Sequence, residues 1–189
     1  MKTYRNSFNA LFIMYMTLFL LGISSPSQAA INTAKEIDVS VDATLDRFMK
    51  EVTGADIFMK KSSGVLIFPK VYKAGFGIGG EYGEGALRVG GKTIDYYSTA
   101  AASIGFQFGA QAKSIILIFT KRKALEAFKK SDGWEAGVDG SVALIDMGMG
   151  DSLDTTNVKD PIVAFIFGQK GLMYNLTLEG SKFSHITPK

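Results

Sequence analysis

The sequence predicts an α+β domain, in which a strongly curved, mostly antiparallel sheet or partly closed β-barrel carries about three α-helices. Two observations lead to this prediction. First, 11 of the 21 glycines fall between Gly64 and Gly109, where large apolar residues alternate with Gly or Gln. An alternation of period two is typical of strands, and a nearly bare face lets a sheet bend sharply. Second, three segments carry apolar residues at helical spacing.

The segment before this domain has the layout of a secretory signal peptide. Lys2 and Arg5 precede an apolar run, Leu11 to Ile23, which is followed by small residues. The run is shorter than the roughly 20 residues that span a bilayer. We expect cleavage after Ala29, with cleavage after Ala30 as an alternative and an uncleaved anchor as the rival interpretation. Residues 1–29 are therefore the predicted signal peptide, and residues 30–189 are the predicted single domain.

Charge and cysteine content narrow the possible partners. The chain has no cysteine, so the sequence predicts no disulfides, no thiol chemistry and no acylation as a lipoprotein. We therefore expect an exported protein that is periplasmic or secreted. Removal of Lys2 and Arg5 leaves 19 basic against 18 acidic residues, a net charge of +1. That balance provides no general attraction to nucleic acid, and none is predicted as a partner.

The first predicted helix covers residues 33–52. Its apolar positions are Ile37, Val41, Leu45, Phe48 and Val52. Acidic residues are frequent on its polar face, whereas helices that lie in a membrane interface are usually basic there. We expect this helix to pack against the sheet.

Two shorter helices are predicted at residues 55–61 and 121–130. Gly64 follows the first of them, and Thr120 is a plausible N-cap for the second. The residues expected to face inward are Ile57, Phe58, Ala124, Leu125 and Phe128.

Strands are predicted at residues 65–68, 75–82, 86–89, 93–97, 103–110 and 114–119, with a hairpin turn at Gly90–Gly91. Residues 115–119 are apolar on both parities, as in a strand covered on both faces. A strand around residues 136–147, a polar loop to 159 and a hairpin of residues 162–167 and 172–179 complete the prediction. The parity predicts a set of core residues and a set of glycines that permit close approach, namely Phe76, Ile78, Phe106 and Phe108 in the core and Gly75, Gly77, Gly105 and Gly109 on the bare face.

The glycine-rich segments resemble the SYLF domain, a lipid-binding family whose fungal members also bind actin. The resemblance is carried by GVLIFP at 64–69, KAGFGIGGEYGEG at 73–85 and SIGFQFGAQ at 103–111, with weaker echoes at 170–172 and 178–181. It extends over roughly residues 33 to 185 and departs from the family pattern at 139–150. It implies affinity for anionic membrane lipid and implies no catalytic chemistry.

Clustered basic residues are the candidate site for lipid headgroups. Three of them crowd the start of a helix, where the helix dipole disfavours cations. This crowding is consistent with a phosphate-bearing partner or with a solvated surface, and both readings stay open. The candidate headgroup-binding residues are Lys60, Lys61, Lys70, Lys73, Lys121, Arg122, Lys123, Lys129 and Lys130.

Residues for catalysis or metal binding are few. His185 is the single histidine, and the Gly75-x-Gly77-x-x-Gly80 pattern is not followed by the helix that a dinucleotide site requires. Glu81 and Glu84 are expected to satisfy backbone or lysine groups. No enzyme activity, metal or cofactor is therefore predicted.

The predicted function is non-enzymatic binding of anionic phospholipid or phosphoinositide-like headgroups at the bacterial cell envelope, by peripheral membrane association. The alternative is an envelope module that binds another protein and has no specific lipid ligand. The sequence leaves the oligomeric state open.

Overall fold

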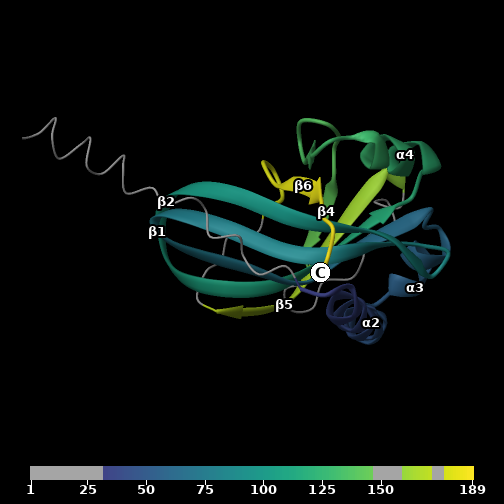
Figure 1. The fold of residues 1–189 in the computed structure, drawn as a ribbon, viewed down its shortest axis with the longest axis horizontal. Coiled ribbons are helices and arrows are strands. Elements are labelled where there is room, and N and C mark those ends of the chain that lie inside the picture. The colour runs from purple at the N-terminus through teal and green to yellow at the C-terminus, as the bar shows by residue number, and fades with distance from the viewer. Residues whose placement is uncertain (1–31, 147–158, 172–176) are drawn as a thin grey trace, which may run out of the picture. The chain divides into compact units, whose positions relative to one another are not determined.

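A long β-hairpin forms the centre of the domain (Figure 1). The computed structural model describes residues 32–146, 159–171 and 177–189, with the side chains at 77, 103–108, 146 and 171 outside that description. Strand β1 (Gly64–Val89) pairs with β2 (Lys92–Phe119) from Gly64 opposite Phe119 to Val89 opposite Lys92. The predicted short strands up to residue 119 merge into these two.

The turn of this hairpin lies at the predicted position. Gly90 and Gly91 have φ values of 58° and 79°, a left-handed conformation that favours glycine at both central positions of a tight hairpin. The predicted Gly90–Gly91 turn is confirmed.

The described strands make one sheet in the order β3-β6-β2-β5-β4, and β1 pairs with β2 in addition. The other strands are β3 (Trp134–Glu135), β4 (Ala143–Asp146), β5 (Ile162–Gly171) and β6 (Lys182–His185). All pairs are antiparallel except β4 with β5. The α+β class with a strongly curved sheet is confirmed.

The curvature brings the two halves of β1 into contact. A Cβ atom at Gly85 would lie 2.0 Å from the carbonyl oxygen of Ile67, and one at Gly83 would lie 2.8 Å from that of Lys70. Distances this short leave no room for a side chain, so glycine is needed for the sheet to fold over itself. The predicted close approach is present at Gly75, since a Cβ there would lie 2.6 Å from the Cα of Gly79, but it is wrong for Gly109, where a Cβ would meet none of the described atoms within 4 Å.

Two hydrophobic cores lie on opposite faces of the curved sheet. Inside the curl, Ile115, Leu117 and Phe119 pack with residues of β1 and of α4 (Arg122–Lys130). On the outer face, Ile116 and Ile118 pack with residues of α2 (Ala34–Glu51) and α3 (Ala55–Lys60). The prediction that residues 115–119 are covered on both faces is confirmed.

Helix α2 packs against the outer face of the sheet, as predicted. It begins with a capping box in which Thr33 accepts from the Glu36 backbone and Glu36 accepts from the Thr33 backbone. Ile37, Val41 and Phe48 are buried. None of the helices in the described ranges is long and apolar enough to cross a membrane.

Two local predictions about the short helices are wrong. Ile57 on α3 is 39% exposed, because Ala55 and Phe58 are the residues of that helix that are buried, with Met59 partly buried against the same core. Thr120 is not the N-cap of α4, because its hydroxyl donates to the carbonyl of Asp160, and Lys121 occupies the cap position without a side-chain hydrogen bond.

The largest error concerns the middle of the hairpin. The side chains of Phe76 and Ile78 were expected in the core, and they are 74% and 72% exposed. Residues 101–110 of β2 pair with β1 and with no other described strand, so this ribbon extends beyond the layers that would cover it. The side chains of Phe106 and Phe108 lie outside the described residues.

The C-terminal part differs from prediction in its strand boundaries. The strand expected around 136–147 is reduced to β4, and β6 was not predicted, because its four residues KFSH bury only Phe183. The first strand of the last hairpin is confirmed as the start of β5, but β5 continues to Gly171 through residues 168–171, which were expected between the two strands. The polar loop at 147–158 and the core of the second strand, 172–176, lie outside the described residues.

Candidate anion-binding pocket

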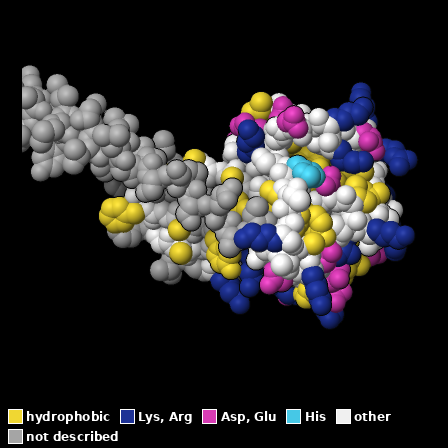
Figure 2. Space-filling model, in the orientation of Figure 1, with side chains coloured by type: hydrophobic (Ala, Val, Ile, Leu, Met, Phe, Trp, Pro, Cys, Tyr) yellow, Lys and Arg dark blue, Asp and Glu magenta, His cyan; other side chains and the backbone are white. Residues whose placement is uncertain are grey.

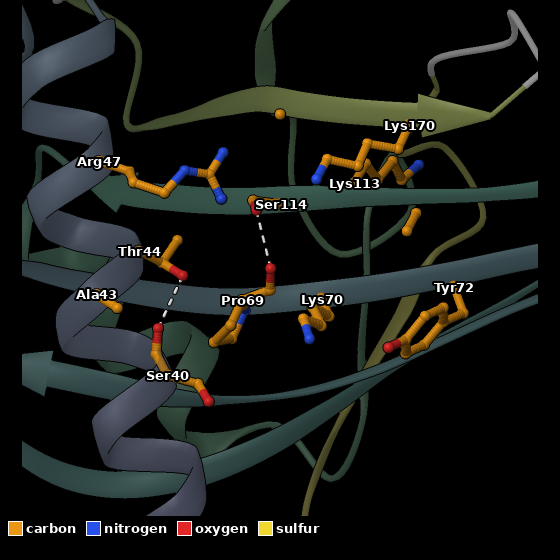
Figure 3. Close-up of a pocket in the computed structure, with 12 residues that line it drawn as sticks. Ser40, Ala43, Thr44, Arg47, Pro69, Lys70, Tyr72, Lys113, Ser114 and Lys170 are labelled. Atoms are coloured by element: carbon orange, nitrogen blue, oxygen red, sulfur yellow. Dashed lines mark hydrogen bonds between the residues drawn. The ribbon is translucent and has the colours of Figure 1, made fainter.

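A hollow of about 450 Å³ lies where α2 passes over β1, β2 and β5 (Figure 3). This volume falls in the range of small-ligand sites. Its lining residues are Ser40, Ala43, Thr44, Arg47, Pro69, Lys70, Tyr72, Ala112, Lys113, Ser114, Gly168 and Lys170. Four of these carry a positive charge, and none of these described lining residues is acidic.

Two β-bulges open the sheet at this position. In β1, Phe68 and Val71 pair with Ile115 and Lys113, so β1 has one residue more than β2 between them. A second register shift lies on the other side of β2, where β5 carries an extra residue opposite Lys113. Bulges bend a strand and change the direction of its side chains, and proline is tolerated there because it has no N–H to donate.

A buried hydrogen bond fixes the first bulge. The hydroxyl of Ser114 donates to the carbonyl oxygen of Pro69 at 2.8 Å, as Figure 3 shows. On α2, the Thr44 hydroxyl donates to the Ser40 carbonyl, also at 2.8 Å. These bonds hold the polar floor and wall of the pocket in a single arrangement, which favours ligand binding because less side-chain ordering is needed.

Arg47 is the cation that α2 contributes, and several groups orient it. Its guanidinium carbon lies 5.3 Å from the centroid of the Phe167 ring, and its Nε lies 3.3 Å from Oε1 of Glu51. Gly168 leaves room for it, since a Cβ there would lie 2.2 Å from Arg47 Nη2. Gly168 also has a φ of 65°, so glycine is favoured for two independent reasons.

Lys113 forms the buried part of the charge cluster. Its side chain is 1% exposed, and its Nζ lies 3.0 Å from Oε2 of Glu81, whose side chain is 6% exposed. Lys70 and Lys170 are exposed, and in the described parts of the chain neither forms an ion pair with a carboxylate. The pocket therefore has two cations available to an anion from solvent, beside an oriented guanidinium.

This arrangement is suited to a phosphate group. A guanidinium presents its N–H donors in a planar fork that matches phosphate oxygens, and lysine adds mobile point charges. Figure 3 shows Arg47 reaching from α2 toward the strands, with the lysines on the side away from the helix. A phosphate in the hollow would be approached from both sides.

The candidate residues predicted from the sequence are dispersed over the domain. Lys70 lines the pocket, whereas Lys73 is only 6% exposed and belongs to the interior. Lys60 pairs with Asp56 at 3.0 Å on α3, and Lys61 follows it at the helix end.

The remaining predicted residues belong to α4, which packs on the other core. Lys121 and Lys123 border a shallow apolar depression with Ala124, Ala127 and Pro161. Lys129 lies 3.9 Å from Glu126, and Arg122 and Lys130 are exposed at the two ends of the helix. The structure therefore brings one of the predicted residues, Lys70, into the pocket.

Sequence reasoning missed Arg47, Lys113 and Lys170. Arg47 stands among acidic residues on α2, and neither Lys113 nor Lys170 has another basic residue beside it in the sequence. Gly168, directly after the apolar residues 162–167, was the available signal, because an isolated glycine in a strand often marks a bulge.

The two glutamates of the glycine-rich segment have the predicted structural role. Glu81 pairs with Lys113, and Glu84 accepts hydrogen bonds from the Asn32 backbone and side chain at 3.0 and 2.8 Å and from the Tyr82 hydroxyl at 2.9 Å. Burial, followed by the hydrogen bond to Glu84, raises the pKa of Tyr82 to about 12.

Within the described ranges, no three His, Cys, Asp or Glu side chains are grouped closely enough to hold a metal ion. His185 pairs with Asp95 and packs edge-on against Tyr97, which fastens β6 to β2.

The fold and the pocket define an α+β domain with a basic hollow at a bulged sheet. Residues 100–187, just under half of the chain, match the family model Ysc84, which is described as Las17-binding protein actin regulator. The match confirms the predicted resemblance to the SYLF-domain family, known for lipid binding and actin regulation. It includes the β2 and β5 sides of the pocket. No curated protein matches the chain.

Proposed function

We propose that this protein binds the phosphate-bearing headgroups of anionic phospholipids, phosphoinositide-like lipids among them, in the pocket between α2 and the sheet. Binding is non-enzymatic and attaches the protein peripherally to a membrane. The observation that carries the proposal is the convergence of Arg47, Lys70, Lys113 and Lys170 from four different elements on one hollow. The SYLF family, to which the matched model points, is known for lipid binding, and this supports the same ligand class.

The energetics fit a weak and reversible attachment. A cation close to an anionic membrane surface contributes about 1 kcal/mol, so Arg47, Lys70 and Lys170 acting together are sufficient for peripheral binding. Figure 2 shows further Lys and Arg side chains on one face of the domain, interspersed with Asp and Glu, so electrostatic attraction to an anionic surface is local and not general. Attraction of this kind decreases with ionic strength, whereas a phosphate held within the pocket is screened less.

The test is cosedimentation of the exported protein with phosphatidylcholine vesicles, with and without phosphatidylglycerol or phosphatidylinositol phosphate, at low and at physiological salt. We expect binding to the anionic vesicles and very little to the neutral ones. A protein that ignores anionic lipid at both salt concentrations contradicts the proposal.

The second candidate is a protein-interaction module without a specific lipid ligand. It is favoured by the exposed apolar side chains of the domain and by the family description, which names a protein partner. An apolar protein contact would persist as salt rises. Salt dependence therefore separates the two candidates.

We place this activity at a bacterial cell envelope, in the periplasm or outside the cell. The support is the signal-peptide layout of residues 1–29 and the absence of cysteine from the sequence. The intact mass of the exported protein should correspond to a chain that begins at Ala30 or Ile31. Recovery of a membrane-embedded species that retains residues 1–22 would contradict export with cleavage.

A further inference from the structure

We propose that the bend of β1 inserts the side chains of Phe76 and Ile78 into the hydrocarbon edge of the membrane whose headgroup the pocket binds. The inference rests on the proposed function and adds an apolar contact to it. The two side chains are 74% and 72% exposed, the highest values among the large hydrophobic residues of the described chain, together with Val138. Exposed apolar residues grouped together typically mark an interaction site.

The bend projects from the rest of the sheet. The register shifts between Phe76 and Ile78, whose partners in β2 are Phe108 and Ile104, so β2 carries two additional residues there. On its other edge β2 pairs with β6 up to Ala100 and with β5 from Gln111 onward. The two-stranded ribbon between these positions reaches past the other described strands (Figure 1).

The order of residue types along β1 follows the order of depth in a membrane. Lys70 and Tyr72 line the pocket, and Tyr72 is 59% exposed. Phe76 and Ile78 follow on the same strand. A strand rises about 3.3 Å per residue, so Ile78 lies up to about 26 Å along the chain from Lys70. Cations suit the headgroup layer, tyrosine suits the interface, and Phe and Ile suit the hydrocarbon.

A membrane fits this surface better than an apolar protein partner does. The two large side chains described at this bend cover far less than the roughly 800 Å² that each partner contributes to a stable protein interface. They are sufficient for an interfacial membrane contact that acts together with charge. The basic pocket, which Tyr72 helps to line, is complementary in charge to an anionic bilayer. Figure 2 shows exposed hydrophobic side chains toward the end of the domain where β1 and β2 bend.

The absence of cysteine from the sequence allows a direct test. A single cysteine is introduced as Ile78→Cys and labelled with the environment-sensitive fluorophore NBD. The matched control is Val138→Cys, because Val138 is also 72% exposed but lies in the turn after β3. Each labelled protein is mixed with phosphatidylcholine vesicles containing phosphatidylglycerol, with and without lipids that carry a quencher on the acyl chain, and cosedimentation is measured in parallel.

We expect the label at position 78 to brighten about threefold or more and to be quenched by the acyl-chain quencher, while the label at position 138 changes little. In unlabelled protein, Ile78→Ser should weaken vesicle binding about tenfold and Val138→Ser should leave it unchanged. If the protein cosediments but the label at 78 stays unquenched, the bend does not insert and headgroup binding stands. If the wild type does not cosediment, the proposed function fails, and the insertion fails with it.

Discussion

The two basic regions of the domain are built in opposite ways. At the start of α4, Lys121, Arg122 and Lys123 are adjacent in sequence and exposed, and no carboxylate of the described residues pairs with them. In the pocket, the cations are distant in sequence and come from α2, β1, β2 and β5. Their positions depend on two bulges, on an aromatic ring and on a buried ion pair.

This difference shows that a high local density of positive charge is not the same as a binding site. Adjacent cations on a helix attract any anionic surface but do not define a shape. The pocket combines cations with hydroxyl groups in a hollow, and a hollow of defined shape is the kind of site that selects among ligands.

Lys113→Met should lower the free energy of unfolding by about 3–5 kcal/mol, because it leaves the Glu81 carboxylate buried without its partner. The same substitution at the exposed helix start, Lys123→Met, should change it by less than about 0.5 kcal/mol. Urea titration measures both. The double variant Glu81→Gln, Lys113→Met should recover part of the loss. Equal stability of the two single variants would mean that the pocket cations are no more integrated into the fold than those of α4.

Neutralising Lys121, Arg122 and Lys123 together as glutamines should weaken binding to anionic vesicles by roughly 3 kcal/mol, about a hundredfold, at low salt. The loss should shrink severalfold at physiological ionic strength, because exposed charges are screened. The fold should be intact, as checked by thermal melting. If the triple variant loses as much vesicle affinity at physiological salt as it does at low salt, the helix start itself forms a specific site.

Gly168→Ala should reduce stability by about 1–2 kcal/mol and vesicle affinity by a few fold. The new Cβ meets Arg47 Nη2 and the backbone has positive φ. Gly180→Ala is the matched control, since Gly180 has a φ of 75° and open space where the Cβ would lie. Both variants should lose stability from strain, and only Gly168→Ala should lose affinity. If the two variants bind vesicles with equal affinity, the position of the Arg47 side chain does not matter for binding.

The sequence was sufficient for the features that depend on local pattern. Period-two alternation and the Gly90–Gly91 pair predicted the hairpin, and apolar spacing predicted α2 with its inward residues. The alternation around Phe76 and Ile78 correctly predicted a strand, but it did not show that these two side chains are exposed. Period two fixes which residues share a face, and only the neighbouring strands decide whether that face is covered.

The pocket could not be predicted in the same way. It depends on the pairing of β5 with β2, and on the one extra residue that β1 and β5 each carry where they pair with β2 around Lys113. Both features are set by the register between segments that are distant in sequence. Clustering of cations in the sequence pointed to α4, because that is the only kind of proximity that a single sequence displays. Lys70 was found because it adjoins the glycine-rich segment.

Cosedimentation of matched triple variants at physiological salt tests the account most directly. The pocket variant carries Arg47→Gln, Lys70→Gln and Lys170→Gln, and the helix-start variant carries glutamine at 121, 122 and 123, so the same charge is removed from each. If headgroups bind in the pocket, the pocket variant should bind vesicles containing anionic lipid about a hundredfold more weakly than wild type, while the helix-start variant should lose much less affinity. Equal losses, or a pocket variant that binds as wild type does, would contradict it.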